Sequence, residues 1–157
     1  MRRALPIVIA AALALTPAMA SAEVQWRLLK QHGQPYLQGM PDESESDNEF
    51  WALCRAGGAI EVGIGADSNV GKGEGEPVSV TLTSAGARAT VNGRSRKSMN
   101  FEMTAGTELQ TQVSRDDALF KVLAAGQPIT VAGSIKTATW PAKGLKAKVA
   151  AFLAACK

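Results

Sequence analysis

The sequence predicts a mainly β protein: an antiparallel β-sandwich or partly open barrel of about eight strands, with one short inserted helix and a C-terminal helix. Short segments in which apolar and polar side chains alternate recur along the chain, as half-buried strands require. Turn signals such as Gly57-Gly58 and Asn92-Gly93 separate these segments. Apolar spacing of three and four residues, typical of a helix that packs on a sheet, is clearest at the C-terminus.

The first 22 residues have the pattern of a secretory signal peptide. Arg2 and Arg3 precede an apolar run, and small residues allow cleavage after Ala20 or after Ala22. The run of about a dozen apolar residues is shorter than the ~20 that a membrane-spanning helix needs. We therefore expect residues 1–22 to be removed and residues 23–157 to form one β-rich domain, in a bacterial periplasm or outside the cell.

Cleavage changes the charge of the working protein. The whole chain has 17 Lys and Arg against 14 Asp and Glu, and removal of Arg2 and Arg3 leaves 15 against 14, a formal net charge of +1. A nearly neutral domain argues against nucleic acid as the partner. We expect a protein partner in the envelope or outside the cell, and a chain that is a monomer or a weak oligomer.

In the first half of the chain we expect five strands, over residues 23–31, 36–40, 49–55, 60–64 and 78–83. In the third of these, Phe50, Ala52 and Cys54 face one side and the intervening side chains the other, so both faces are at least partly covered. An acidic polar connection (41–48) precedes this strand, and residues 66–76 read as a flexible, glycine-rich loop.

In the second half we expect a hairpin in which residues 87–91 and 94–104 flank a type I′ turn at Asn92-Gly93. On its return limb Met99, Phe101 and Met103 share one face. A strand over 109–113 leads to a capping box at Ser114 and a helix over 118–125 that ends at Gly126. A last strand over 128–135 precedes the closing helix, whose expected buried face is Leu145, Val149, Phe152, Leu153 and Cys156.

Cys54 and Cys156 are the two cysteines of the chain. In an exported protein two cysteines most simply form one disulfide, here closing a loop of about 100 residues. The alternative is a pair of free or metal-binding thiols. A structural zinc ion needs four ligands, and the spacing is not that of a redox-active Cys-x-x-Cys pair.

The sequence offers little catalytic or metal-binding chemistry. The single histidine, His32, lies beside a turn and nothing ties it to a nucleophile. Asp67, Asn69 and Gly71 have half the pattern of a calcium loop, and so do Asp42 and the serines that follow it, but neither has the closing glutamate. We therefore expect no metal, no cofactor and no enzymatic activity.

The candidate binding residues are basic: Arg88, Arg94, Arg96 and Lys97, which flank the predicted Asn92-Gly93 turn. On such a hairpin Arg94 and Arg96 share a face, with Arg88 across from them on the paired strand. The cluster is a candidate contact for an acidic partner. A solvated hairpin tip that resists edge pairing is the alternative interpretation.

Three segments resemble a group of small exported proteobacterial proteins: residues 41–47, Leu123 to Gly126, and Gly144 to Cys156. The group comprises the invasion-associated locus B family and the TagO-like accessory proteins of type VI secretion. Locus B proteins carry more cysteines than this chain does. The resemblance implies a periplasmic, non-enzymatic β-rich domain, and it carries over no binding residue.

The predicted function is that of a non-enzymatic periplasmic binding or accessory module that acts on an envelope or protein partner. One alternative is an inhibitor of a lysozyme-like enzyme that inserts the loop 66–76 into a cleft. The other is a hydrolase of cell-wall or glycan substrates that uses carboxylates of the acidic loop, Asp42 and Glu43 among them.

Overall fold

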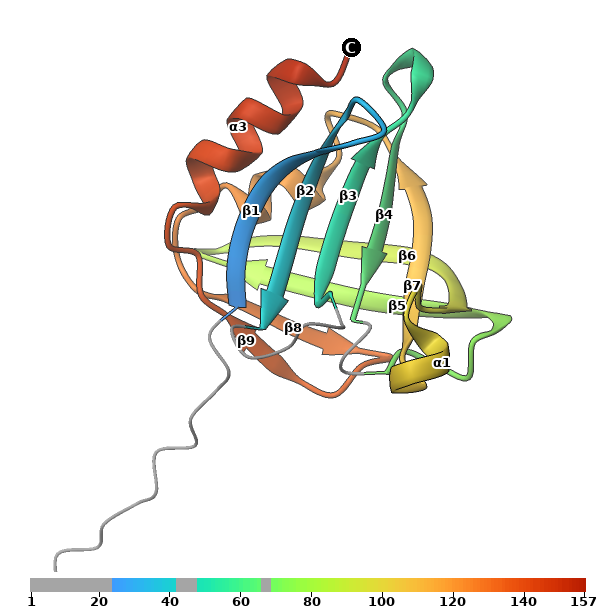
Figure 1. Ribbon diagram of the computed structural model, residues 1–157. Helices are drawn as coiled ribbons and strands as arrows, with labels where there is room; N and C mark the ends of the chain where they lie inside the picture. Colours follow the sequence, from blue (N-terminus) through green and yellow to red (C-terminus); the bar gives the residue numbers. More distant parts are fainter. Residues whose placement is uncertain (1–23, 42–47, 66–68) are drawn as a thin grey trace, which may run out of the picture.

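In the computed structural model, residues 24–41, 48–65 and 69–157 are described, and their strands form one antiparallel sheet that curls into a nearly closed barrel (Figure 1). The strands are β1 (Val24–Gln31), β2 (Gln34–Pro41), β3 (Phe50–Cys54), β4 (Ile60–Ile64), β5 (Glu74–Ser84), β6 (Ala87–Lys97), β7 (Thr107–Val113), β8 (Ile129–Gly133) and β9 (Ala138–Trp140). Their order in the sheet is β1-β2-β3-β4-β7-β6-β5-β8-β9. The prediction of a mainly β, antiparallel fold is confirmed.

The described helices are α1 (Phe101–Thr104), α2 (Ala118–Leu123) and α3 (Leu145–Ala155), with one 3₁₀ turn at Ala56–Gly58. Figure 1 shows β1 to β4 crossing in front of β5 and β6 at a steep angle, while β7 joins the two layers. Helix α3 packs against β1 and β2, and α2 packs against β5 and β6. None of the helices within the described ranges is long and apolar enough to span a membrane.

The two edge strands of the sheet, β1 and β9, meet through side chains rather than through a strand ladder. The ring centroids of Trp26 and Trp140 lie 6.0 Å apart, and Trp26 Nε1 donates a hydrogen bond to the carbonyl oxygen of Pro141 at 2.6 Å. Gly39 leaves the space that the Trp26 ring occupies, since a Cβ there would lie 2.8 Å from a ring carbon. These contacts close the barrel and cover its edges.

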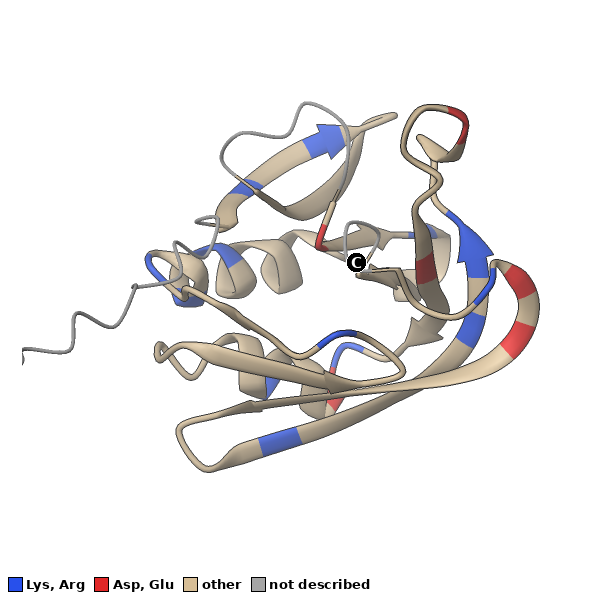
Figure 2. Cartoon of the chain, turned by 90° about the horizontal axis from the view of Figure 1, so that it is seen from below, with Lys and Arg blue, Asp and Glu red and all other residues tan. Residues whose placement is uncertain are grey.

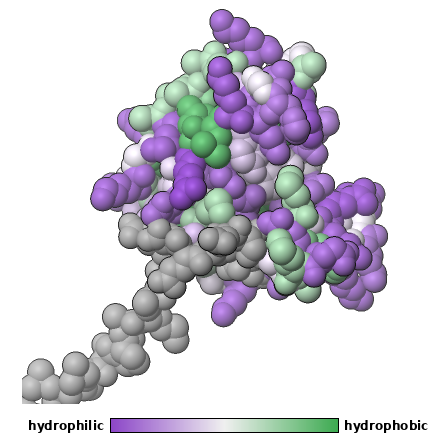
Figure 3. All heavy atoms as spheres, in the orientation of Figure 1, coloured by the Kyte–Doolittle hydropathy of each residue, from purple (hydrophilic) through white to green (hydrophobic). Residues whose placement is uncertain are grey.

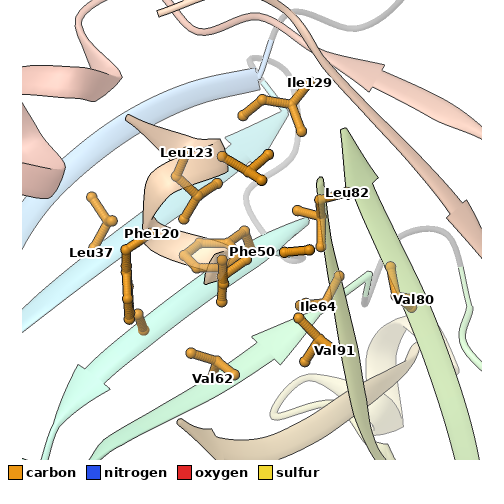
Figure 4. Close-up of a cluster of buried hydrophobic side chains, with 14 of the residues drawn as sticks. Leu37, Phe50, Val62, Ile64, Val80, Leu82, Val91, Phe120, Leu123 and Ile129 are labelled. Carbon is orange, nitrogen blue, oxygen red and sulfur yellow. The ribbon is translucent and has the colours of Figure 1, made fainter. Parts of the chain in front are cut away.

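The core lies between the two layers and uses the alternation that the sequence predicts. Phe50, Val62 and Ile64 point inward from one layer and meet Val80, Leu82 and Val91 from the other (Figure 4). Helix α2 adds Phe120 and Leu123 to the same cluster from its buried face, while Ala118 and Lys121 on its other face are exposed. Alternation in the strands thus sorts one set of side chains into the core and leaves the other set on the outer face.

The Cys54–Cys156 disulfide is present, with the two Cα atoms 5.5 Å apart and a sequence separation of 102. It joins the end of β3 to the residue that follows α3. Leu145, Val149 and Phe152 are buried on the face of α3 that the sequence predicts, and Leu153 is partly buried. The prediction of a closing helix fixed to the sheet through Cys156 is therefore confirmed.

The predicted turn at Asn92-Gly93 is wrong. Strand β6 runs through both residues, and the turn between β5 and β6 lies at Ala85-Gly86, whose φ angles are +48° and +81°. Gly93 serves a different purpose: a Cβ there would lie 2.5 Å from the carbonyl oxygen of Gln110 on β7. The glycine allows close approach of two strands, and a hairpin at this point would remove the pairing of β6 with β7.

Two local predictions in the second half are also wrong, and one strand was not predicted. The strand predicted to continue to residue 104 ends at Lys97, and α1 follows, with Met99 and Met103 80% and 76% exposed. The side-chain cap of α2 is Asp117, which accepts a hydrogen bond from the amide of Leu119, rather than Ser114. The short strand β9 was not expected, because three residues are too few for a periodic signal.

The loop predicted for residues 66–76 is described from residue 69 onwards, and it is not the flexible loop predicted from its composition. Residues 74–76 begin β5, and residues 69–73 are held against β6 and β7. Val70 is fully buried, and its amide donates to the carbonyl oxygen of Thr107 at 2.9 Å. The amide of Gly73 donates to Ser95 Oγ at 2.8 Å, and that of Thr107 donates to Asn69 Oδ1 at 3.0 Å. The buried side chain of Val70 and these hydrogen bonds fix the conformation of a segment whose glycine-rich sequence predicts flexibility.

Candidate functional site

The outer face of the layer formed by β1 to β4 and β7 carries the candidate site. Across it Gln38, Trp51, Gly63 and Gln110 lie in register on four neighbouring strands. These residues alternate with core residues, so their side chains point away from the core. Figure 3 views this side of the molecule and shows a hydrophobic patch over β1 and β2 surrounded by hydrophilic residues.

Two adjoining hollows of about 290 and 280 Å³ lie on this face and share Asn48, Met99 and Asn100 as lining residues. The first extends over β3, β4 and β7 and is lined by Trp51 and Glu108. The second extends over β1 and β2 and is lined by Tyr36, Gln38 and Leu29, among others. We call the two together the outer-face groove. The connection from β6 to β7, which includes Met99 and Asn100, forms their common wall.

A buried carboxylate lies in the groove. Glu108 is only 3% exposed although it stands on the outer face of its strand. Trp51 Nε1 donates to Glu108 Oε2 at 2.9 Å, and Gln110 Nε2 donates to Glu108 Oε1 at 2.7 Å. Hydrogen bonds from these donors offset part of the cost of removing a carboxylate from water.

Gly63 makes the contact between Trp51 and Glu108 possible. Strand β4 separates β3 from β7, and a Cβ at position 63 would lie 2.1 Å from Trp51 Nε1. The indole of Trp51 occupies that space and reaches across β4 to the carboxylate. A glycine in the middle of a strand therefore positions the aromatic ring of the groove.

Tyr36 joins this polar network at the end of the second hollow. Burial raises the pKa of Tyr36 to about 12, and the carboxylate of Glu108 contributes in the same direction. The hydrogen bond that Asn48 Nδ2 donates to the phenolic oxygen, at 3.4 Å, lowers the pKa of Tyr36 and so opposes these effects. The hydroxyl of Tyr36 is thus neutral over the whole physiological pH range.

Ser98, which lines the first hollow, has a buried hydroxyl that finds no hydrogen-bond partner within the described residues. The residue is 7% exposed, and its backbone amide and carbonyl both make hydrogen bonds. An unsatisfied buried hydroxyl costs about 1–3 kcal/mol, so a group that supplies the missing hydrogen bond binds with advantage.

Charged side chains at the rim of the first hollow nearly balance. Arg55 forms an ion pair with Glu61 across the end of the β3–β4 hairpin. Lys97 Nζ lies 4.2 Å from the ring centroid of Phe101, in a cation–π contact. With Glu108 as the buried charge, the groove shows no strong excess of either sign.

The structure separates Arg88 from Arg94, Arg96 and Lys97, with which the sequence analysis grouped it. Arg88, Arg94, Arg96 and Lys97 all lie on β6, and Arg88 is roughly 20 Å from Arg94 because six residues of extended chain separate them. Figure 2 shows the basic segments of this strand spread along its length, with acidic residues at one end. Arg94 Nη1 donates to the carbonyl oxygen of Gly75 at 3.0 Å, and Arg96 pairs in register with Glu74.

The other residues considered from the sequence contribute no site. His32 is exposed in the β1–β2 turn, with φ of +50°. Asn69 is engaged with Thr107, as described above, while Asp42, Glu43, Ser44, Ser46 and Asp67 lie outside the described residues. Among the residues that the structure does describe, no three His, Cys, Asp or Glu side chains are grouped so that they could hold a metal ion.

Sequence reasoning missed the groove, although two signals pointed to it. Glu108 and Gln110 are polar residues on the outer side of a strand that faces the core through Leu109. Gly63 stands at an outward position of β4, between the inward-facing Val62 and Ile64, and a glycine within a strand is typical of close approach by another group. The position of Trp51 over that glycine follows only from the pairing of β3 with β4.

Comparison of the chain with family models, with curated proteins and with solved structures finds no match. The resemblance to locus B and TagO-like proteins therefore stays a prediction. The outer-face groove is the feature of this chain that bears on its function.

Proposed function

We propose that the chain is a non-enzymatic binding module of the bacterial envelope, exported through its N-terminal 22 residues, which holds its partner in the outer-face groove. The Cys54–Cys156 disulfide supports an oxidising compartment, since such bonds persist in exported proteins and are rare in the reducing cytosol. The outer-face groove, whose rim includes Lys97 of β6, is the surface that supports a binding role.

The observation that most supports this proposal is the buried carboxylate of Glu108, which is hydrogen-bonded to the indole of Trp51. Folding of this sheet needs an apolar inner face and does not need a desolvated carboxylate on the outer one. A buried charge, an aromatic ring and a hydroxyl without a partner in one hollow form a set that the fold itself does not require. Polar groups of this kind, gathered in a concave surface, are typical of a binding site.

A non-enzymatic role fits the positions of the carboxylates described in the groove. A hydrolase of glycans uses two carboxyl groups that face each other across the scissile bond. Of the two glutamates that line the first hollow, Glu61 is paired with Arg55, and Glu108 accepts hydrogen bonds from Trp51 and Gln110. Incubation with labelled cell-wall glycan should release no soluble fragments, and release that Glu108→Gln abolishes would contradict the proposal.

The test of the binding function is capture from an envelope extract by the immobilised mature chain, beginning at Glu23. We expect a component retained in stoichiometric amount by the wild type and lost with Trp51→Ala. Arg88→Ala is the matched control, because this exposed side chain lies on β6 outside the groove. Thermal unfolding of both variants establishes that they are folded.

Loss of the component with Arg88→Ala and retention with Trp51→Ala would place binding on β6 and overturn the assignment to the groove. Equal retention by the wild type and both variants would also overturn the assignment to the groove. Glu108→Gln provides a second groove variant, since it keeps the size of the side chain and removes its charge.

A further inference from the structure

We propose that the ligand of the outer-face groove is a neutral or weakly charged oligosaccharide, a proposal that rests on the binding function assigned above. Four properties of the groove support it: the combination of side chains that line it, its position on the sheet, its charge, and its length. The hydroxyl of Ser98 provides a fifth observation.

The lining side chains match the two kinds of surface that a sugar ring presents. A pyranose has an apolar face of C–H groups, which packs on an aromatic ring such as that of Trp51. Its rim carries hydroxyl groups that both donate and accept hydrogen bonds. Asn48, Asn100 and Gln38, which line the groove, carry amides that also do both.

The position of the groove argues against an extended peptide. A peptide strand is bound most simply at a sheet edge, where backbone groups without partners continue the ladder. The groove lies on the face of the sheet from β1 to β7, and of these strands all but β1 are paired on both sides. An extended peptide there would leave its backbone groups to be satisfied by side chains, whereas an oligosaccharide has no such requirement.

The charge of the groove argues against a polyanion. In the first hollow Lys97 and Arg55 are opposed by Glu61 and Glu108, and Lys30 is the one charged residue among the described lining residues of the second hollow. Binding of phosphate-rich polymers depends on a clear excess of cations, which release counterions from the polymer. The affinity of a ligand with no charge, or with few charges, does not depend on such an excess of cations.

The length of the groove fits a chain of sugars better than a single small molecule. The two hollows adjoin and together extend from β1 to β7. Five neighbouring strands spaced ~4.8 Å apart span roughly 19 Å, enough for an oligosaccharide of about four rings. Each hollow alone lies at the lower limit of ordinary ligand pockets.

The hydroxyl of Ser98 is the position at which a ligand would improve the hydrogen bonding of the protein. It lines the same hollow as Trp51, is buried, and has no partner within the described residues. Sugar hydroxyls supply both a donor and an acceptor, so either orientation of the Ser98 hydroxyl is satisfied. Ser98→Ala should therefore weaken oligosaccharide binding without loss of folding stability.

The experiment is isothermal titration calorimetry of the mature chain with two tetrasaccharides: one of N-acetylglucosamine and one of glucose. A tetrapeptide of glycine and serine and a tetraphosphate are the competing probes. We expect a tetrasaccharide to bind, at least tenfold weaker binding for Trp51→Ala, weaker binding for Ser98→Ala, and unchanged binding for Arg88→Ala. Calorimetry is used because it does not depend on the fluorescence of Trp51.

The outcomes distinguish failure of the oligosaccharide proposal alone from failure of the binding function as well. Failure of both tetrasaccharides, together with a captured envelope component that Trp51→Ala loses, overturns the oligosaccharide and leaves the binding module. Binding of the peptide or the tetraphosphate alone also overturns the oligosaccharide. Tetrasaccharide binding that Trp51→Ala leaves unchanged places the ligand outside the groove and overturns both. Gly63→Ala replaces Trp51→Ala if the latter does not fold.

Discussion

Trp51 and Glu108 are joined by a 2.9 Å hydrogen bond that passes over β4, because the residue of β4 beside the indole is Gly63. The contact links strands β3 and β7, which do not pair with each other. One missing Cβ therefore decides where the aromatic ring of the groove lies, and with it the hydrogen bonding of the buried carboxylate.

Gly63→Ala should displace the indole of Trp51 and break its bond to Glu108, since the new Cβ would lie 2.1 Å from Nε1. We expect the free energy of unfolding to fall by about 1–3 kcal/mol, from crowding and from the lost donor to a buried carboxylate. Urea denaturation of the two proteins measures the difference.

The control for Gly63→Ala is a double-mutant cycle with Trp51→Ala. Once the indole is absent, the added methyl group meets no ring, so Gly63→Ala should cost much less in that background. Equal costs in the two backgrounds would contradict the role assigned to the glycine.

Tyr36 should titrate well above ordinary tyrosine. It is the single tyrosine of the chain, so tyrosinate absorbance after a rapid pH jump reports it alone. With a pKa raised from 10.0 to about 12 in the folded state, its contribution to stability is present below pH 10. That contribution, roughly 2–3 kcal/mol, is lost as the pH rises towards about 12.

Glu108→Gln should lower the pKa of Tyr36 but leave it above its ordinary value, because burial is the larger cause and remains. The variant therefore tests whether Glu108, in the first hollow, influences the pKa of Tyr36, in the second. A midpoint near the ordinary value in the folded wild type would show that Tyr36 is not desolvated.

Replacing both Cys54 and Cys156 by Ser should reduce the stability of the oxidised protein by about 2–5 kcal/mol. The disulfide closes a long loop, with a sequence separation of 102, and it fixes the end of α3 to β3. Chemical denaturation with and without reductant is the measurement. The reductant should destabilise the wild type and leave the double variant unchanged; an effect on neither would mean that the bond adds nothing.

Ala85→Asn should stabilise the protein by about 0.5–1 kcal/mol, because Asn tolerates the left-handed region better than Ala and Asn-Gly is the preferred pair for this turn. Ala85 has φ of +48° and precedes Gly86 in the β5–β6 turn. The urea midpoint should rise. Ala87→Asn, at a strand position directly after the turn, is the matched control and should not stabilise.

Much of the fold could be predicted from local patterns. Alternation in 60–64 and 78–83 identified two strands with their buried faces, and the spacing of Leu145, Val149 and Phe152 identified the buried face of α3. These predictions succeed because the side chains that define the period are the same ones that enter the core.

The errors arose where local preference met a tertiary constraint. Asn92-Gly93 is the better turn sequence, yet the turn formed at Ala85-Gly86, which leaves β6 long enough to pair with both β5 and β7. The glycine-rich residues 69–73 have no local reason to be ordered, and burial of Val70 between neighbours orders them. A local pattern of a few residues contains no information about the strand with which β6 pairs or about the residues that pack around Val70.

The sequence by itself determined the fold class, the inward faces of most strands, the closing helix and the cysteine pair, because these follow from periodicity and from the small number of cysteines. Only the tertiary structure decided the order of the strands, the closure of β1 against β9 through Trp26 and the groove. The physical reason is distance along the chain. Trp51 and Glu108 are separated by 57 residues, and only the pairing of β3, β4 and β7 brings them together.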